Sequence, residues 1–175
     1  GVVESESIKP AGDAFDEAIV RYVRRKHNIL IGKRTAEELK IGIACLVPRA
    51  EVGIQEVKGR CLTTGLPKSV KISSVELVEA IAEPARDILE TIHMVLERTP
   101  PELVSDVAQN GIVMAGGGSL IYGFDQLVEK DTGIRTTVVD DALSCAAFGS
   151  GKMLMNLNDM PEGMVNLARK RQMKA

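Results

Sequence analysis

A run of three glycines after a short apolar segment is the strongest indication of a binding site in this sequence. Residues Ile112–Met114 suit a buried strand, and Ser119 opens a helical pattern behind the glycines Gly116, Gly117 and Gly118. Because glycine has no Cβ, the backbone of such a turn can approach a flat or anionic ligand, and free N–H groups at a helix start supply donors and positive potential. When the triplet is considered alone, a tight turn that needs glycine for its dihedral angles is the simpler explanation.

Two groups of charged residues could add polar contacts to such a site. Glu37 and Lys40 are three residues apart on a predicted helix and share one face, so together they could hold the two hydroxyls of a ribose. An exposed intrahelical ion pair explains the same spacing. Asp13 and Asp16 also share a face beside Gly12 and could contact a sugar or Mg²⁺-bound water, although helix capping is an adequate role for Asp13.

Other kinds of chemistry find little support in the residue types. His27 and His93 have no histidine or cysteine partner at metal-ligand spacing, which argues against a metal site and against a histidine-based triad. The three cysteines, Cys45, Cys61 and Cys145, are odd in number and far apart, which suits a reducing cytosol and favours neither a disulfide scaffold nor a zinc site. P-loop and nucleophile-turn motifs are also missing from the sequence. We therefore predict no catalytic residue and no metal ligand in this chain.

Composition and charge exclude several classes of protein. The chain has 175 residues, of which 45% are hydrophobic and 26% charged, the balance of a globular protein with one domain or two small subdomains. A net charge of −2 and the absence of tryptophan provide neither the positive surface nor the stacking rings that nucleic acid binding uses. No apolar run reaches membrane-spanning length. Because the chain opens on Gly1 within a segment typical of a sheet interior, we expect it to be part of a larger fold.

Periodicity and helix breakers predict the elements that position these residues. Strands are expected at residues 2–9, 51–60, 68–73, 111–115 and 135–139. Helices are expected at residues 13–26, 35–45, 74–99, 101–108, 119–130 and 142–151. We predict a capping box at Thr35 and Glu38, an N-cap at Ser74, and a kink or break at Pro84. The closing strand-helix-strand-helix unit indicates an α/β fold, with a helix-rich insertion in the middle.

Taken in order, these pieces resemble the second half of the MreB family of bacterial actins. The resemblance covers nearly the whole chain to about residue 157, and it is specific because many separate motifs follow in the order of the family. Small departures from the family pattern are the alanines at positions 11, 44 and 142. The matching motifs are Gly12–Ile19, Tyr22–Arg25, Ile31–Gly32, Thr35–Glu37 with Lys40, Glu83–Pro84, Pro100–Leu103, Gly116–Leu120, Glu129 with Thr132–Ile134, and Asp141–Lys152.

This resemblance implies the actin/Hsp70/sugar-kinase architecture, a ribonuclease H-like α/β fold in which two similar domains close over ATP. The chain would form most of the second domain, with a mixed sheet, helices and an inserted smaller α+β subdomain. We expect residues 1–31 and 108–157 to form the sheet-containing subdomain (IIA-like) and residues 32–107 to form the inserted one (IIB-like). Residues 158–175 would form a C-terminal tail without a counterpart in the family pattern.

In the family, the glycine turn packs against adenosine, the Glu-x-x-Lys pair reaches the ribose and the adenine edge, and the start of the first helix lies near the cleft. The implied nucleotide-binding residues of this chain are Glu37, Lys40, Gly116, Gly117, Gly118, Ser119, Gly12 and Asp13. The family's phosphate-binding turns and catalytic acid belong to the first domain, so ATP with Mg²⁺ is expected as a ligand of the full-length protein. We expect this chain alone to bind ATP weakly and to hydrolyse none.

The function that the resemblance implies is that of a rod-shape-determining cytoskeletal protein. The full-length protein would bind and hydrolyse ATP and polymerise head to tail into filaments that direct cell shape and cell-wall synthesis. It would be cytoplasmic, and its first domain would associate with the inner membrane and the cell-wall elongation machinery. Two alternatives stay open. One is a non-polymerising ATPase of the superfamily, such as an Hsp70-like chaperone or a sugar kinase, and the other is an interaction module that has lost nucleotide binding.

Overall fold

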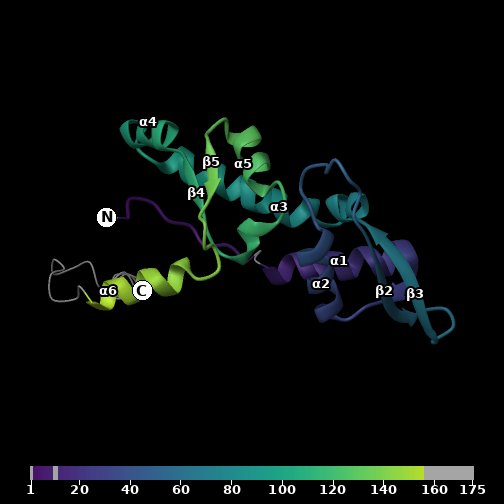
Figure 1. Cartoon of the computed structure of the whole chain (residues 1–175). Coiled ribbons are helices and arrows are strands. Elements are labelled where there is room, and N and C mark those ends of the chain that lie inside the picture. Colours follow the sequence, from purple (N-terminus) through teal and green to yellow (C-terminus); the bar gives the residue numbers. More distant parts are fainter. Residues whose placement is uncertain (1, 10–11, 156–175) are drawn as a thin grey trace, which may run out of the picture.

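The structure is a computed structural model that describes residues 2–9 and 12–155, and it shows an elongated molecule (Figure 1). Its helices are α1 (Gly12–His27), α2 (Lys33–Ile43), α3 (Ser74–Arg98), α4 (Pro101–Asn110), the 3-10 turn η1 (Gly117–Leu120), α5 (Phe124–Thr132) and α6 (Cys145–Met155). Its strands are β1 (Ile29–Leu30), β2 (Ile54–Cys61), β3 (Pro67–Ser73), β4 (Ile112–Met114) and β5 (Thr136–Val138). The hairpin of β2 and β3 lies at one end of the molecule and α4 lies toward the other. The predicted tail, residues 158–175, falls outside the described residues.

Two small sheets carry the strands. Strands β1, β2 and β3 form an antiparallel sheet in that order, and Val57 faces Val70 across the hairpin that the sequence predicts. Strands β4 and β5 are parallel, with Ile112 opposite Thr136, and α5 connects them as expected. Helices and strands occur together, as the α/β prediction expected, but antiparallel and parallel strands lie in separate sheets, and neither described sheet is the mixed sheet that was predicted.

The prediction of a strand at residues 2–9 is wrong. Their sequence pattern predicts a strand, yet these residues pair with neither of the two described sheets. A strand needs hydrogen-bond partners on a neighbouring strand, and a sequence pattern does not supply them. The segment is instead linked to α3 by an ion pair between Glu6 and Arg98, with 2.8 Å between Oε2 and Nη1.

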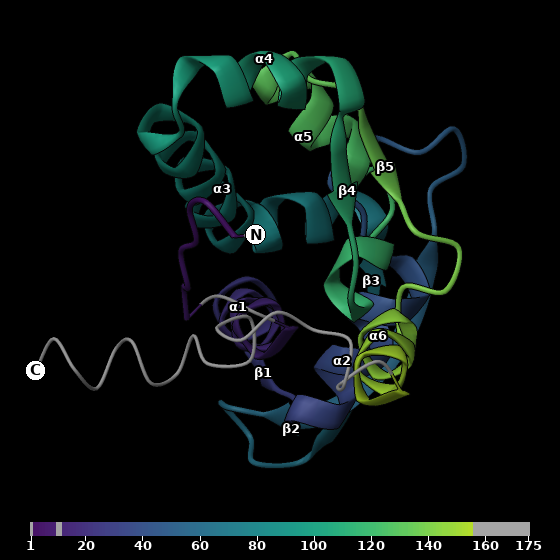
Figure 2. The ribbon, with the colours of Figure 1, turned by 90° about the vertical axis from the view of Figure 1, so that its left-hand side faces the viewer.

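Helix α1 lies at the centre of the packing. Its side chains Phe15, Ile19 and Val23 recur every four residues and are fully buried, and the helix packs against both α2 and α3. Figure 2 looks along α1 and shows α3, α4 and the β4–β5 pair on one side of it and α2 on the other. Phe15 meets Phe124 of α5 edge to face, with ring centroids 6.3 Å apart. One continuous core therefore contains residues of both predicted subdomains, and it holds α1, α2 and α5 in fixed relation.

The start of α2 differs from its prediction. The helix begins at Lys33, with Gly32 as its N-cap, so Thr35 lies inside the first turn and caps nothing. Glu38 forms an ion pair with Arg34 instead, with 3.2 Å between Oε1 and Nε. The predicted capping box is therefore wrong, because an earlier start of the helix places both of its members within the helical hydrogen-bond pattern.

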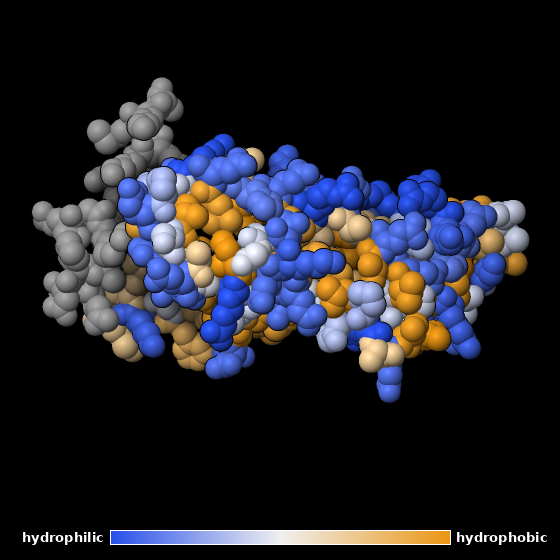
Figure 3. Space-filling view, turned by 90° about the horizontal axis from the view of Figure 1, so that it is seen from above, coloured by the Kyte–Doolittle hydropathy of each residue, from blue (hydrophilic) through white to orange (hydrophobic). Residues whose placement is uncertain are grey.

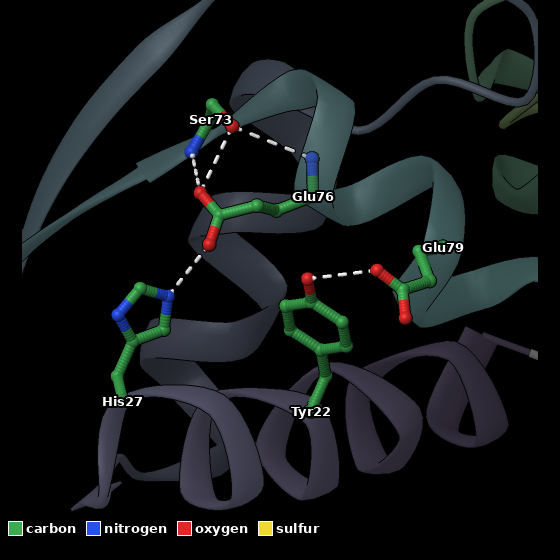
Figure 4. A network of polar contacts seen from close by, with 5 residues as sticks. All are labelled: Tyr22, His27, Ser73, Glu76 and Glu79. Carbon is green, nitrogen blue, oxygen red and sulfur yellow. Dashed lines mark hydrogen bonds and ion pairs between the residues drawn. The ribbon is translucent and has the colours of Figure 1, made fainter.

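Helix α3 begins with a capping box at Ser73, one residue before the predicted cap Ser74. The Ser73 hydroxyl accepts a hydrogen bond from the Glu76 N–H (3.4 Å), and the Glu76 carboxylate accepts one from the Ser73 N–H (2.9 Å), as Figure 4 shows. Ser74 is buried, and its hydroxyl accepts a hydrogen bond from the Gly53 N–H. The structure describes α3 as one helix that continues through Pro84, so the alternative of a break at this proline is wrong.

A polar network links the end of α1 to the start of α3 (Figure 4). His27 Nε2 lies 2.7 Å from Glu76 Oε1, and the Tyr22 hydroxyl donates a hydrogen bond to Glu79 over 3.1 Å. Burial, followed by the hydrogen bond to Glu79, raises the pKa of Tyr22 to about 12. Burial alone would raise the pKa of Glu76, but the donors of Ser73 and the contact with His27 outweigh it and hold this pKa below its ordinary value.

We expect the contribution of Glu76 to stability to disappear in acid. Because its pKa is lower in the folded than in the unfolded chain, this contribution is fully present above the ordinary value of 4.5 and is lost as the pH falls through the folded-state pKa. The free energy of unfolding of the wild type should exceed that of Glu76→Gln near neutral pH, and the difference should shrink below pH 4.5. Urea unfolding at a series of pH values measures this difference, and a constant difference would contradict the role assigned to the carboxylate.

Helix α6 lies at the surface of the molecule. Helix α6 begins at Cys145, after a turn that contains Ala142, and none of its residues is buried. Apolar side chains gather in two areas of the face that Figure 3 shows. Among the described helices, none is long and apolar enough to cross a membrane.

Candidate functional site

A cavity of about 440 Å³ brings together residues from distant parts of the sequence. It contains five of the predicted site residues, namely Gly12, Glu37, Lys40, Gly117 and Gly118. Asp13, Gly116 and Ser119, which were also predicted, are not among the residues that line it. The lining residues that the sequence did not single out as site residues are Ile41, Ala44, Arg49, Leu120, Ile121, Tyr122 and Leu143. We refer to this cavity as the glycine-turn pocket.

One side of helix α2 forms a wall of the glycine-turn pocket. The residues that line it follow one another at steps of three, one and three positions, which places them on one face: Glu37, Lys40, Ile41 and Ala44. Leu39, on the opposite face, is fully buried in the core. The structure gives Glu37 and Lys40 no ion pair with each other in the part of the chain that it describes. The alternative explanation of their spacing, an exposed ion pair within the helix, is therefore wrong. The Glu37 carboxylate is exposed and can accept hydrogen bonds from a ligand.

Lys40 is held by α1. Its Nζ lies 2.8 Å from Asp16 Oδ1 and donates a hydrogen bond to the Gly12 carbonyl over 3.2 Å, and the two charged side chains are only 14% and 9% exposed. Asp16 Oδ1 has no hydrogen bond of good geometry, so the ammonium compensates this carboxylate mainly through its charge. Asp13, by contrast, lies in the first turn of α1 and is not the predicted N-cap. Of the two acidic residues that share a face, Asp16 contacts Lys40, and neither of them lines the glycine-turn pocket.

The glycine turn forms the wall opposite α2. Gly116 adopts φ +87°, which only glycine tolerates well, and its N–H donates to the Ala142 carbonyl over 2.8 Å. The Ser119 hydroxyl donates back to the Gly116 carbonyl over 2.7 Å, so Ser119 closes the turn instead of facing the pocket. The predicted helix at 119–130 is divided, because η1 ends at Leu120 and α5 begins only after Gly123.

The glycines that do line the pocket keep their backbone accessible. A Cβ on Gly118 would meet no atom within 4 Å, whereas one on Gly117 would lie 3.2 Å from Leu143 Cδ2. Outside the 3-10 turn itself, no described acceptor takes a hydrogen bond from the N–H of either glycine. These N–H groups can therefore donate to a ligand that approaches the backbone closely.

Arg49 and Tyr122 form a third wall that the sequence did not reveal. The Arg49 guanidinium lies over the Tyr122 ring, 4.5 Å from its centroid, and donates a hydrogen bond to the Ala44 carbonyl over 3.1 Å. The Leu46 N–H donates to the Tyr122 carbonyl over 2.9 Å, which ties the loop after α2 to the segment after η1. The two residues are far apart in the sequence, so no local motif contains both, and the fold alone brings them together.

The residue types limit what this site can do. Backbone N–H groups, one ammonium, one guanidinium and one carboxylate surrounded by apolar side chains suit a small ligand with both a ring and hydroxyl groups. Among the described residues, no three His, Cys, Asp or Glu side chains come close enough to hold a metal ion. Cys45, Cys61 and Cys145 are not paired in disulfides.

The comparison with known families identifies the chain. The family model described as "MreB/Mbl protein" matches residues 1–162. The chain is similar to the cell shape-determining proteins Mbl of Bacillus cereus, at 40% identity over 161 residues, and MreB of Escherichia coli, at 45% identity over 154 residues. These alignments cover 92% and 88% of the chain but 48% and 44% of the two relatives, so the chain spans about half of their length.

Solved structures agree with this result. MreB5 of Spiroplasma citri bound to AMPPNP matches with a TM-score of 0.88 and 36% identity, over 91% of this chain and 48% of that one. The MamK double helical filament matches with a TM-score of 0.71 and 26% identity, over 88% of this chain and 46% of that one. The predicted actin-like α/β fold is thus confirmed. The chain belongs to the MreB/Mbl family of actin-like proteins.

Proposed function

We propose that the glycine-turn pocket binds the nucleoside part of ATP in an actin-like protein that forms filaments. The observation that carries this proposal is the convergence of Glu37 and Lys40 with Gly117 and Gly118 on one cavity of about 440 Å³. Pockets of roughly 300–1,000 Å³ are usual for small molecules. The solved relatives support the ligand, because MreB5 of Spiroplasma citri was crystallised bound to AMPPNP and bound to ADP.

Each residue has a role that its position suggests. The Glu37 carboxylate would accept hydrogen bonds from the ribose hydroxyls, and the Lys40 ammonium would donate to the ribose and to the adenine edge. The backbone of Gly117 and Gly118 would pack against the adenosine, with Gly116 and Ser119 shaping the turn. Gly12, whose carbonyl accepts from Lys40, would border the cleft near Asp13.

The phosphates and Mg²⁺ would be held mostly by the other half of the full-length protein. The glycine-turn pocket offers one carboxylate, Glu37, and Mg²⁺ prefers several oxygen ligands, some of which phosphates supply. Hydrolysis requires positioned phosphates and a positioned water, which the described residues do not provide by themselves. This chain would therefore contribute the nucleoside contacts, and hydrolysis would depend on closure of the complete cleft.

The proposal extends to assembly and to the cell. Head-to-tail contacts between identical copies leave a free surface at each end and so build open filaments, and the related MamK was solved as a double helical filament. We propose that the filament directs cell shape and cell-wall synthesis from the cytoplasm, and that the first half of the protein links it to the inner membrane and the elongation machinery. Residues 1–31 with 108–157, and residues 32–107, would be the two subdomains that border the cleft.

Sedimentation of the full-length protein tests the proposal. We expect the wild type to pellet with ATP and to stay soluble with ADP or without nucleotide. Lys40→Ala should bind ATP about 10- to 100-fold more weakly, since a hydrogen bond from a charged donor is lost, and its ATP-dependent pelleting should disappear. Because this variant also leaves the Asp16 carboxylate buried without its counter-charge, its binding is measured only at a temperature at which circular dichroism shows it folded. Glu37→Gln, which changes an exposed side chain, should weaken binding without a loss of thermal stability.

Lys33→Ala is the matched control for Lys40→Ala. Lys33 lies on the same helix but pairs with Glu17 at the surface, where its side chain is 70% exposed, so this variant should pellet like the wild type. A wild type that binds ATP but never pellets would contradict the filament and favour a non-polymerising ATPase of the superfamily. A folded wild type that binds no nucleotide would contradict the site and favour an interaction module.

A further inference from the structure

Arg49 is a second cation of the glycine-turn pocket, and its position is fixed on two sides. Its Nη2 donates to the Ala44 carbonyl at the end of α2, and its guanidinium face covers the Tyr122 ring. Tyr122 is fixed in turn, since it forms a parallel bridge with Cys45 and its carbonyl accepts from Leu46. The Arg49–Tyr122 pair is therefore a pre-organised flat wall, which loses little conformational freedom when a ligand packs against it.

One donor of this wall lacks an acceptor. The Arg49 Nε atom is buried from solvent and has no hydrogen-bond partner among the described residues. A buried N–H without an acceptor is destabilising, and the cost is larger when the group is charged. Arg49 lines the glycine-turn pocket, but Nε itself has no surface that a ligand could contact, so a ligand there meets the other N–H groups of the guanidinium. It also borders a neighbouring cavity of about 410 Å³, but of these two cavities only the glycine-turn pocket is lined by Tyr122 and Lys40.

The surroundings decide which part of a nucleotide Arg49 would meet. Its guanidinium lies at the C-terminal end of α2, where the helix dipole creates negative potential that disfavours a phosphate. Its neighbours in the pocket, Ala44, Ile121 and Tyr122, are apolar or aromatic. Lys40, in contrast, is directed toward Gly12 at the start of α1. A neutral heteroaromatic ring suits the Arg49 end better than an anionic group does.

We propose that Arg49 and Tyr122 bind the base of the nucleotide, with the Arg49 guanidinium donating to an acceptor atom on the purine ring. The inference rests on the proposed function, because it assigns the base end of the same pocket. It adds two specificity-determining residues to the contacts of the ribose and the glycine turn. The ring would lie against the wall that the two side chains form, and N–H groups of the guanidinium other than Nε–H would donate to it.

Binding of adenosine, ADP and ATP to the full-length protein, measured by displacement of a fluorescent ATP analogue, tests this inference. Arg49→Met keeps the length of the stem but removes the donors, and we expect it to weaken all three ligands by the same factor, about 5- to 20-fold. Arg49→Lys keeps the charge but lacks the planar guanidinium, so it should restore little of the affinity. Arg34→Met changes an arginine in the first turn of α2 that is 91% exposed, and it should bind all three ligands like the wild type.

The outcomes separate the inference from the proposed function. A loss that increases from adenosine to ATP would overturn the inference, because it would assign Arg49 to the phosphates. Unchanged binding by Arg49→Met in a protein that binds ATP normally would also overturn it, while the proposed function would stand. If no variant and no wild type binds nucleotide, the proposed function itself fails. Should Arg49→Met fold poorly, Tyr122→Leu provides a second test, with the same uniform loss expected for the three ligands.

Discussion

Asp16→Ala is expected to lower the free energy of unfolding by about 3–5 kcal/mol, because it leaves the ammonium of Lys40 buried without its counter-charge. The two side chains are 9% and 14% exposed, and Nζ lies 2.8 Å from Oδ1. Without Asp16, the ammonium keeps only the Gly12 carbonyl, which carries no net charge. Urea unfolding followed by circular dichroism measures the change.

The surface ion pair of Glu17 and Lys33 offers the matched control. Its side chains are 52% and 70% exposed, so Glu17→Ala should cost less than about 1 kcal/mol. The double variant Asp16→Leu with Lys40→Met replaces the buried pair by apolar side chains and should recover most of the stability lost in Asp16→Ala. Equal losses for Asp16→Ala and Glu17→Ala would show that water reaches the inner pair and would refute the buried-charge argument.

Gly123→Ala should be the second strongly destabilising change, at about 2–5 kcal/mol, since it combines two costs. Gly123 adopts φ +76°, in the left-handed region that strains an alanine, and an added Cβ would overlap the Cγ2 atom of Val47. Val47 belongs to the loop that carries Arg49, so this loop would have to move away from the segment before α5. Thermal and urea unfolding of the variant measure the combined cost.

Gly133→Ala separates the two costs, because Gly133 has nearly the same backbone angle, φ +71°, and open space around its Cβ position. It should lose only the backbone part, about 1–2 kcal/mol. Adding Val47→Ala to Gly123→Ala removes the overlap and should restore part of the difference, reduced by the cavity that the smaller side chain leaves. If Gly123→Ala and Gly133→Ala are equally destabilising, the loop yields without cost and the close contact has no energetic role.

Local sequence patterns predicted many helices and strands, because these elements depend on residues that are close to one another in the sequence. The four-residue spacing of Phe15, Ile19 and Val23 was sufficient for α1, and the two strand patterns around Gly65 were sufficient for the hairpin. The glycine turn was recognised for a similar reason, since few other residues tolerate the angle of Gly116. The order of such motifs along the chain was enough to predict the family.

Helix starts were predicted less well, because the same local pattern can be used or ignored. Ser73 with Glu76 and Thr35 with Glu38 have identical spacing, yet only the first pair forms a capping box. At the start of α3, Glu76 is held by Ser73 and His27, whereas α2 begins two residues before Thr35. The choice depends on where the preceding chain lies and on which partners other elements provide.

The sequence by itself determined the periodic elements, the glycine turn and the membership of this protein in its family. Only the tertiary structure decided which side chains contact one another at the site. Spacing within α2 favoured Glu37 as the partner of Lys40, but the packing of α1 against α2 brings Asp16 within 2.8 Å instead. Arg49 and Tyr122 became neighbours in the same way. The physical reason is that spacing reports contacts within one helix or strand, while burial of a shared core sets the contacts between them.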